Sequence, residues 1–297
     1  PVDFHLDALE KLGAKIELKN GYIEATSKKL TGCEINFPGV SVTGTENIMM
    51  AAVLAKGQTV LRNVAKEPEV EDLANFLNSM GAQINGAGTD EIIINGVEAL
   101  DGAEFSIPAD RIEAGTYLIA AAITGGDVTI SNVQAHRMNN ILDKLELSGA
   151  SINVGEDNIQ LIMENDSILP VDISTAPFPG FPTDMQAQFT VLNALSKGSS
   201  VVTENVFENR FMHVQELNRM GCDITVKGSN AFVKGVNSLN GAPVMATDLR
   251  ASASLILAGL CAKGETIVDR IYHIDRGYER IEEKLSYLGA DITRLPN

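Results

Sequence analysis

The sequence predicts an α/β protein built from repeated helix and strand units and divided into two domains. Three observations predict this class: a glycine motif that recurs five times, a second motif that alternates with it, and a composition suited to packed domains. Because 44% of the 297 residues are hydrophobic and only 21% are charged, the chain can form a sizeable core.

The first motif closes an amphipathic helix and opens a strand. Phe76, Leu77 and Met80 repeat at helical spacing, and Gly81 then supplies a residue that tolerates a left-handed backbone before the next strand. Successive copies lie 68, 68, 72 and 68 residues apart, a regularity typical of repeat architectures. The five glycines are Gly13, Gly81, Gly149, Gly221 and Gly289.

The second motif is an alanine-rich helix followed by a glycine turn and a β-branched strand, as in residues 51–60. Its helices are apolar nearly all round, which predicts that they lie inside the protein and are walled by sheets. The four copies turn at Gly57, Gly126, Gly198 and Gly264.

The order of the two motifs predicts the domain organisation. Each copy of the second motif precedes a copy of the first, but the first motif at Gly13 has no such predecessor. We therefore expect residues 1–108 to be the remainder of a first domain that is truncated before Pro1, and residues 109–297 to form a second domain.

Charge and residue patterns exclude several classes of function. The 39 acidic and 23 basic residues give a net charge of −16, so the surface repels nucleic acid and anionic lipid, and neither is expected as a partner. No apolar run approaches the roughly 18 to 20 residues of a membrane span. Cys33, Cys222 and Cys261 lack metal-ligand spacing and cannot all pair, which favours a reducing cytoplasm and no metal site.

Four segments together carry a resemblance to a known family: residues 181–188 (FPTDMQAQ), 206–211 (VFENRF), 247–252 (TDLRAS) and 272–279 (YHIDRGYE). They closely resemble the UDP-N-acetylglucosamine 1-carboxyvinyltransferases, which are enolpyruvyl transferases, and the similarity runs the whole length of the chain. The resemblance implies two inside-out α/β barrel domains of three repeats each, with roughly 110 to 130 residues preceding Pro1.

The resemblance also implies a reaction and its partners. The enolpyruvyl group of phosphoenolpyruvate passes to the 3-hydroxyl of UDP-N-acetylglucosamine and phosphate leaves, the first committed step of peptidoglycan synthesis in the cytoplasm; no cofactor is implied. The hydroxyl needs a base, the methylene carbon a proton donor, and the anionic groups fixed cations. The family's acid cysteine lies in a loop that would end just before Pro1. We therefore expect this chain to need a missing N-terminal segment of the same enzyme and to be inactive alone.

Two aspartates match active-site positions of the family. Asp184 matches the base for the sugar hydroxyl, and Asp248 is its equivalent in the next repeat and matches a second catalytic aspartate. Both stand at the start of a predicted helix, where aspartate is favoured as an N-cap without any catalysis. Position alone leaves cap and base open, and the resemblance favours the base.

Three arginines are expected to bind phosphoenolpyruvate, because guanidinium groups suit phosphate and carboxylate groups. The counterparts of Arg250 and Arg276 contact this substrate in the family, and Arg276 is also expected to act in catalysis; Arg210 is expected to position the substrate or intermediate. We expect Arg250 and Arg276 to converge on one cleft, with Asp184 nearby on the sugar side. The alternative is that each forms a surface ion pair of little consequence.

The family binds the nucleotide sugar through the segment after its reactive loop and through a Val-Ser-Val strand end. Here Asp3 is expected to accept a hydrogen bond from uracil, and Ser41 or backbone amides to meet phosphate oxygens. Gly39 stands where some relatives carry lysine, and an ordinary edge strand is the alternative for residues 40–42. The expected UDP-sugar residues are Pro1, Val2, Asp3, Phe4, Val40, Ser41, Val42, Asp184, Val206 and Phe207.

Two other functions compete with this interpretation. The shikimate-pathway enolpyruvyl transferase shares the fold and needs no uridine pocket, but residues 181–188 and 272–279 favour the UDP-sugar type. A non-enzymatic ring or clamp is also built from repeated α/β units, and its helix-facing surface would carry lysines. The repeat helices around Ala51, Ala120, Asn193 and Leu257 are apolar instead, which favours a packed interior.

Overall fold

The computed structural model describes residues 2–164 and 168–295, and its contacts divide the chain into two units. Unit 1 comprises Pro1–Pro108 with Pro177–Pro179, and unit 2 comprises Ala109–Ala176 with Gly180–Asn297. Residues 177–179, which fall inside the predicted second domain, group with unit 1 in this division, and the domain boundaries themselves stay a prediction. Whether unit 1 is a truncated domain of a longer fold stays a prediction.

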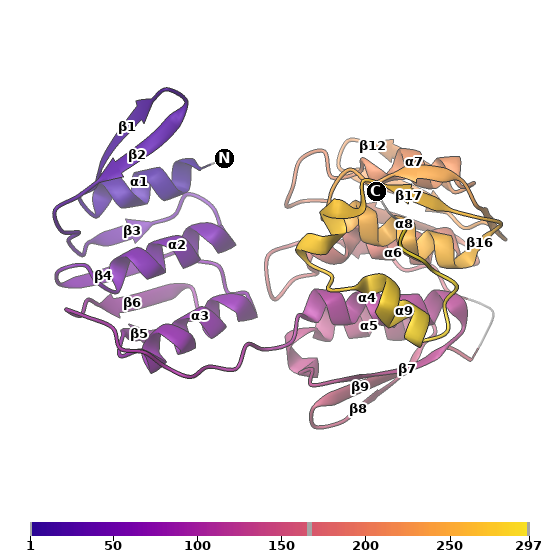
Figure 1. Ribbon diagram of the computed structural model, residues 1–297, viewed down its shortest axis with the longest axis horizontal. Coiled ribbons are helices and arrows are strands. Elements are labelled where there is room, and N and C mark those ends of the chain that lie inside the picture. Colours follow the sequence, from indigo (N-terminus) through magenta and orange to yellow (C-terminus); the bar gives the residue numbers. More distant parts are fainter. Residues whose placement is uncertain (1, 165–167, 296–297) are drawn as a thin grey trace. The chain divides into compact units, whose positions relative to one another are not determined.

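Unit 1 alternates helices with short strands (Figure 1). Its elements are α1 (Asp3–Lys11), β1 (Lys15–Lys19), β2 (Tyr22–Thr26), β3 (Glu34–Asn36), α2 (Val42–Ala52), β4 (Gln58–Arg62), α3 (Pro68–Ser79), β5 (Gln83–Asn85) and β6 (Glu91–Asn95). The strands form a hairpin, β1-β2, and a four-stranded sheet in the order β3-β4-β6-β5.

Unit 2 contains three further repeats. Its helices are α4 (Arg111–Thr124), η1 (Ala135–Arg137), α5 (Asn139–Leu147), η2 (Thr183–Met185), α6 (Gln186–Ala194), α7 (His213–Arg219), α8 (Leu249–Cys261), η3 (Ile271–Arg276) and α9 (Ile281–Tyr287), where η marks a 3₁₀ helix. Its strands are β7 (Asp127–Ser131), β8 (Ser151–Val154), β9 (Asn158–Ile162), β10 (Ile173–Ser174), β11 (Ser199–Thr203), β12 (Asp223–Lys227), β13 (Asn230–Lys234), β14 (Leu239–Asn240), β15 (Pro243–Met245), β16 (Ala262–Lys263) and β17 (Ile267–Asp269).

The sheets repeat one topology, as the sequence period predicts. The order β10-β11-β13-β12 in unit 2 matches β3-β4-β6-β5 in unit 1, and in both sheets the first pair of strands is parallel and the others are antiparallel. The sheet β7-β9-β8 shows the same antiparallel part. The chain is therefore an α/β repeat protein.

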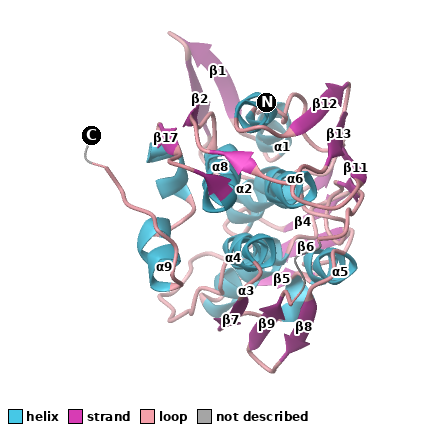
Figure 2. Ribbon diagram, turned by 90° about the vertical axis from the view of Figure 1, so that its right-hand side faces the viewer, coloured by secondary structure: helices cyan, strands magenta, loops and turns pink. Residues whose placement is uncertain are grey.

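Three of the apolar helices form the centre of unit 2. Helices α4, α6 and α8 contact one another, and α4 also lies against β7 and β9 (Figure 2). Every residue of α6 is buried, as are residues 251–258 of α8. The prediction of interior helices with sheets outside them is confirmed within this unit, because a helix without a polar face is stable only when covered on all sides.

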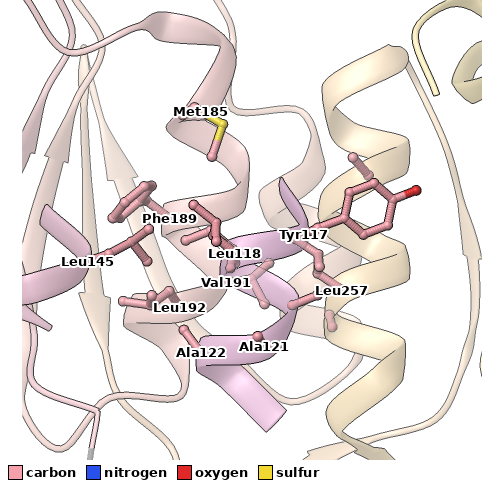
Figure 3. Close-up of a cluster of buried hydrophobic side chains, with 14 of the residues drawn as sticks. Tyr117, Leu118, Ala121, Ala122, Leu145, Met185, Phe189, Val191, Leu192 and Leu257 are labelled. Carbon is pink, nitrogen blue, oxygen red and sulfur yellow. The ribbon is translucent and has the colours of Figure 1, made fainter. Parts of the chain in front are cut away.

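Large side chains from four helices fill this centre (Figure 3). Leu118 of α4, Leu145 of α5, Phe189 of α6 and Leu257 of α8 are at most 1% exposed. Each such side chain stabilises the fold by about 1.5 to 3 kcal/mol relative to exposure. This apolar centre gives the polar residues at the helix starts a rigid support.

The glycine motifs behave as expected, with two differences. Gly13, Gly81, Gly149 and Gly221 have φ between +97° and +103° and each precedes a strand. Gly289 has φ +100°, but the described residues after it, 290–295, form no strand. In the second motif the left-handed residue that ends α4 is Gly125 rather than Gly126. In the described part of the chain, no helix has both the length and the hydropathy to cross a bilayer.

Candidate active site

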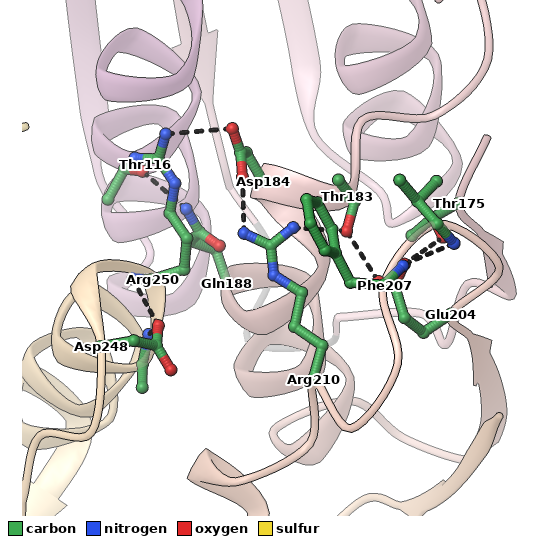
Figure 4. A network of polar contacts seen from close by, with 12 residues as sticks. Thr116, Thr175, Thr183, Asp184, Gln188, Glu204, Phe207, Arg210, Asp248 and Arg250 are labelled. Atoms are coloured by element: carbon green, nitrogen blue, oxygen red, sulfur yellow. Dashed lines mark hydrogen bonds and ion pairs between the residues drawn. The ribbon is translucent and has the colours of Figure 1, made fainter. Parts of the chain in front are cut away.

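Asp184 lies between two guanidinium groups of unit 2 (Figure 4). Its Oδ1 accepts a hydrogen bond from Arg210 Nη2 at 2.6 Å, and its Oδ2 accepts one from Arg250 Nη2 at 3.2 Å. The Asp184 side chain is 39% exposed, whereas those of Arg210 and Arg250 are 22% and 14% exposed. Asp184 lies in the 3₁₀ turn before α6, whose N-cap residue is Met185. Among the residues that the structure describes, the Asp184 carboxylate accepts from Arg210 and Arg250 rather than from a helix amide, so an N-cap role is not what holds this side chain.

The two arginines set the protonation state of Asp184. Burial by itself raises the pKa of this carboxyl, but the positive charges of Arg250 and Arg210 outweigh burial and hold the pKa of Asp184 below its usual value. The group is therefore ionised at neutral pH and can accept a proton.

Arg250 is held from its other side by a buried hydroxyl network that the sequence did not reveal. Its Nη1 donates to the Tyr278 hydroxyl at 3.3 Å, and this hydroxyl lies 2.9 Å from Thr116 Oγ1. Gln188 Nε2 donates to both oxygens, at 3.3 and 3.1 Å. Burial raises the pKa of Tyr278, so its hydroxyl stays protonated. Since Thr116 and Gln188 come from other repeats than Arg250 and Tyr278, no local pattern connects the four residues.

We expect Tyr278→Phe to lower the free energy of unfolding by about 1 to 3 kcal/mol, because the buried groups of Arg250, Thr116 and Gln188 lose a partner. Tyr117→Phe is the matched control: the Tyr117 hydroxyl is also buried but has no hydrogen-bond partner in the described part of the chain. Denaturant unfolding of both variants checks this, and equal stabilities would contradict the role given to Tyr278.

Asp248 has the capping role that the sequence analysis left open. It is the N-cap of α8, and its Oδ1 accepts from the amides of Arg250 and Ala251, both at 2.9 Å. Asp110 does the same for α4, accepting from Ile112 and Glu113. Among the described residues, Oδ2 of Asp248 accepts a hydrogen bond from Thr247 Oγ1 at 3.2 Å. The catalytic role expected for Asp248 stays a prediction.

Arg210 and its neighbours on the loop after β11 also surround Asp184. The guanidinium of Arg210 lies over the Phe207 ring, 4.7 Å from its centre, and donates to Thr183 Oγ1 at 2.5 Å. Phe207 is 56% and Val206 39% exposed. The structure thus brings four of the predicted site residues together, since Arg210, Asp184 and Arg250 are in contact and Phe207 packs on Arg210.

Arg276 is not among the residues that contact Asp184 in the described structure. It ends η3 as an exposed residue, and no hydrogen bond or ion pair joins it to Asp184 or to any other residue that the structure describes. Arg210 and Arg250 therefore make the contacts with Asp184, while the convergence of Arg276 on the same place stays a prediction.

The expected UDP-sugar residues of unit 1 lie at the starts of two adjacent helices. Val2 and Asp3 are exposed at the start of α1, and the Phe4 ring packs beside Gly39, where an added Cβ would lie 3.6 Å away. Asn47 Nδ2 of α2 lies 2.9 Å from His5 Nδ1 of α1, which joins the two helices. Pro1 lies outside the described residues.

Residues 40–42 are neither a strand end nor an edge strand, so both expectations for their structure were wrong. Strand β3 ends at Asn36, Ser41 is the N-cap of α2, and Val42 begins that helix. The Ser41 hydroxyl accepts from the Gly44 amide at 3.1 Å. Two local signals explain this: Pro38 interrupts extended pairing, and serine is a preferred N-cap.

A family model described as EPSP synthase (3-phosphoshikimate 1-carboxyvinyltransferase) matches residues 1–285. The chain belongs to the EPSP synthase family of enolpyruvyl transferases. A relative in this family, the UDP-N-acetylglucosamine 1-carboxyvinyltransferase of Coxiella burnetii (strain Dugway 5J108-111), is 59% identical over 296 residues, which cover 99% of this chain and 68% of the relative.

Solved structures of enolpyruvyl transferases share the fold. The enolpyruvyl transferase NikO from Streptomyces tendae matches with a TM-score of 0.91 and 27% identity, over 99% of this chain and 72% of NikO. An EPSP synthase from Acinetobacter baumannii matches with a TM-score of 0.76 and 20% identity, over 98% of this chain and 71% of that one. The enolpyruvyl transferase fold expected from the sequence is confirmed.

Proposed function

We propose that this chain belongs to an enzyme that transfers the enolpyruvyl group of phosphoenolpyruvate to the 3-hydroxyl of UDP-N-acetylglucosamine, with release of phosphate, in peptidoglycan synthesis. The 59% identity to a protein named for this activity, over 99% of the chain, carries the proposal. The ionised Asp184 beside two arginines gives it a chemical basis. A cytoplasmic location, suggested by three free thiols, is part of the proposal.

In this mechanism Asp184 takes the proton of the sugar 3-hydroxyl as that oxygen attacks phosphoenolpyruvate. Arg250 and Arg210, with Arg276, bind the substrate's carboxylate and phosphate. The anionic substrate competes with Asp184 for the same guanidinium groups. Binding of phosphoenolpyruvate would therefore weaken the stabilisation of the Asp184 carboxylate and make it a stronger base in the complex than in the free enzyme.

The three thiols of this chain do not suit the proton donor that the reaction needs. Burial raises the pKa of Cys222 to about 12 and that of Cys261 to about 11, and burial also raises the pKa of Cys33. A thiol of such high pKa is a poor acid at neutral pH. We therefore propose that the family's acid cysteine belongs to a segment preceding this chain.

Arg276→Lys tests the expected second cation of the phosphoenolpyruvate site. We expect the Michaelis constant for phosphoenolpyruvate to rise about tenfold in the full-length protein, because lysine keeps the charge but loses the planar fork. Steady-state kinetics at saturating UDP-N-acetylglucosamine measure this. A constant that stays within twofold would contradict this role and leave Arg276 as an exposed surface cation.

The proposed activity is tested by phosphate release from the full-length protein with phosphoenolpyruvate and either UDP-N-acetylglucosamine or shikimate 3-phosphate. We expect phosphate to be released when phosphoenolpyruvate is supplied with UDP-N-acetylglucosamine, and not when it is supplied with shikimate 3-phosphate. Release only with shikimate 3-phosphate would favour the shikimate-pathway alternative. A protein that releases no phosphate and shows no saturation-transfer NMR signal with UDP-N-acetylglucosamine would favour a scaffold.

A further inference from the structure

Glu204 is a buried carboxylate beside the candidate active site that the proposed mechanism does not use. It directly follows β11 and is 4% exposed. Its Oε1 accepts from Thr175 Oγ1 at 2.9 Å, from the Val206 amide at 2.9 Å and from the Phe207 amide at 3.0 Å. Its Oε2 accepts from Thr183 Oγ1 at 2.8 Å. Glu204, Thr175 and Thr183 lie together beside Arg210 in Figure 4.

Glu204 is the acceptor in all four of these hydrogen bonds. The Thr183 hydroxyl accepts from Arg210, and the Thr175 hydroxyl accepts from the Asn205 amide, so the proton of each hydroxyl is directed to Glu204. The other two donors are backbone N–H groups. A carboxamide in its place would put an NH2 group at one of the two oxygen positions and could not accept from all four donors.

The two oxygens of Glu204 hold two different parts of the candidate site. Through Oε1 it fixes the backbone that carries Val206 and Phe207. Through Oε2 it accepts the hydroxyl hydrogen of Thr183 and so orients that side chain. Thr183 Oγ1 in turn accepts a hydrogen bond from Arg210 Nη1, and Arg210 Nη2 donates to Asp184. A continuous chain of charge-assisted hydrogen bonds therefore runs from Glu204 through Thr183 and Arg210 to Asp184.

We propose that Glu204 is a positioning residue for the enolpyruvyl transfer: it holds Arg210 against Asp184 through Thr183 and fixes the Val206 and Phe207 loop. This inference rests on the proposed function. Burying a carboxyl group is costly for stability, and an apolar side chain of similar size would serve packing alone better. Its four hydrogen bonds fit a role in orienting the groups around the base.

The main test compares two substitutions of Thr183 in the full-length protein. Thr183→Val removes the hydroxyl that links Glu204 to Arg210 and keeps the shape of the side chain. We expect its kcat to fall about tenfold, with the Michaelis constant for UDP-N-acetylglucosamine within threefold. Thr183→Ser retains the hydroxyl, and we expect its kcat to stay within about twofold of the parent.

Thr190→Val is the matched control for loss of a buried threonine hydroxyl in the same unit. The Thr190 hydroxyl donates to the Gln186 carbonyl at 2.9 Å and touches none of the residues in the chain from Glu204 to Asp184. We expect it to change kcat by less than about twofold. An unchanged kcat in Thr183→Val, or equal losses in the valine and serine variants, would overturn the proposal.

Glu204→Gln supplies a readout that does not depend on turnover. We expect a crystal structure of this variant to show Arg210 displaced from Asp184, because the amide cannot accept from all four donors. Arg210 still bound to both Thr183 and Asp184 would refute the positioning role. If the parent protein shows no turnover, the proposed function fails. The position of Arg210 in the crystal structure of Glu204→Gln still decides whether Glu204 holds Arg210 in place.

Discussion

Replacing Asp184 by asparagine is expected to lower kcat of the full-length protein by about a thousandfold or more, because a carboxamide cannot take the proton of the attacking hydroxyl. Binding should survive the change. We expect the affinity for UDP-N-acetylglucosamine to stay within about tenfold, since the amide keeps the size of the side chain. Affinity for phosphoenolpyruvate should stay equal or improve, because Arg250 and Arg210 no longer have a carboxylate to release. Single-turnover kinetics and equilibrium titration separate these quantities.

Asp223→Asn is a suitable control for this substitution. Asp223 lies on β12 of the same unit, where it is exposed and 4.0 Å from Lys234, so the change should leave kcat within about twofold. Had Asp184 been an N-cap alone, asparagine would serve equally well and turnover would be nearly normal. Near-normal turnover in Asp184→Asn would therefore remove the base from the mechanism.

Arg250→Lys is expected to raise the Michaelis constant for phosphoenolpyruvate about tenfold to a hundredfold and to lower kcat as well. Arg250 uses one terminal nitrogen for Asp184 and the other for the Tyr278 hydroxyl. A lysine ammonium cannot keep both contacts in that geometry, so the cation and the base are both displaced. Initial rates over a grid of both substrate concentrations measure the two effects.

Arg219→Lys is the matched control for Arg250→Lys. Arg219 ends α7 with its side chain 58% exposed, and it contacts Glu216 at 3.5 Å and the Pro243 carbonyl at 3.3 Å. Loss of such exposed contacts is expected to change either kinetic constant by less than about twofold. Similar kinetics for both lysine variants would show that the fork of Arg250 has no special role.

The sequence predicted the repeats well because their signals are local. Burial of α4, α6 and α8 is predicted by the apolar residues within each helix. The left-handed backbone after each amphipathic helix is predicted by a single glycine. The interior position of these helices followed from the lack of a polar face.

The candidate site was predicted only in part, because its contacts join distant repeats. Family resemblance pointed to Asp184, Arg210 and Arg250, and the structure brings these three together. The Tyr278 network carried no local signal, since Thr116 lies 162 residues away from Tyr278. Glu204 was not predicted either, because its hydroxyl partners Thr175 and Thr183 lie 29 and 21 residues before it. Residues 40–42 were misjudged because a valine-rich triplet suggested a strand, whereas Ser41 begins a helix.

The three aspartates at the helix starts of unit 2 suggest how a repeated structure gains a new task. Asp110 and Asp248 secure the first turns of α4 and α8, while the copy at Asp184 makes no such bond and faces two arginines instead. A 3₁₀ turn precedes α6, so this helix begins without an aspartate cap. When a unit is repeated, the equivalent aspartates of two repeats can keep the capping role, and the third aspartate can then bind other partners. Chemistry in such a protein can arise at a single repeat without loss of the architecture that the others preserve.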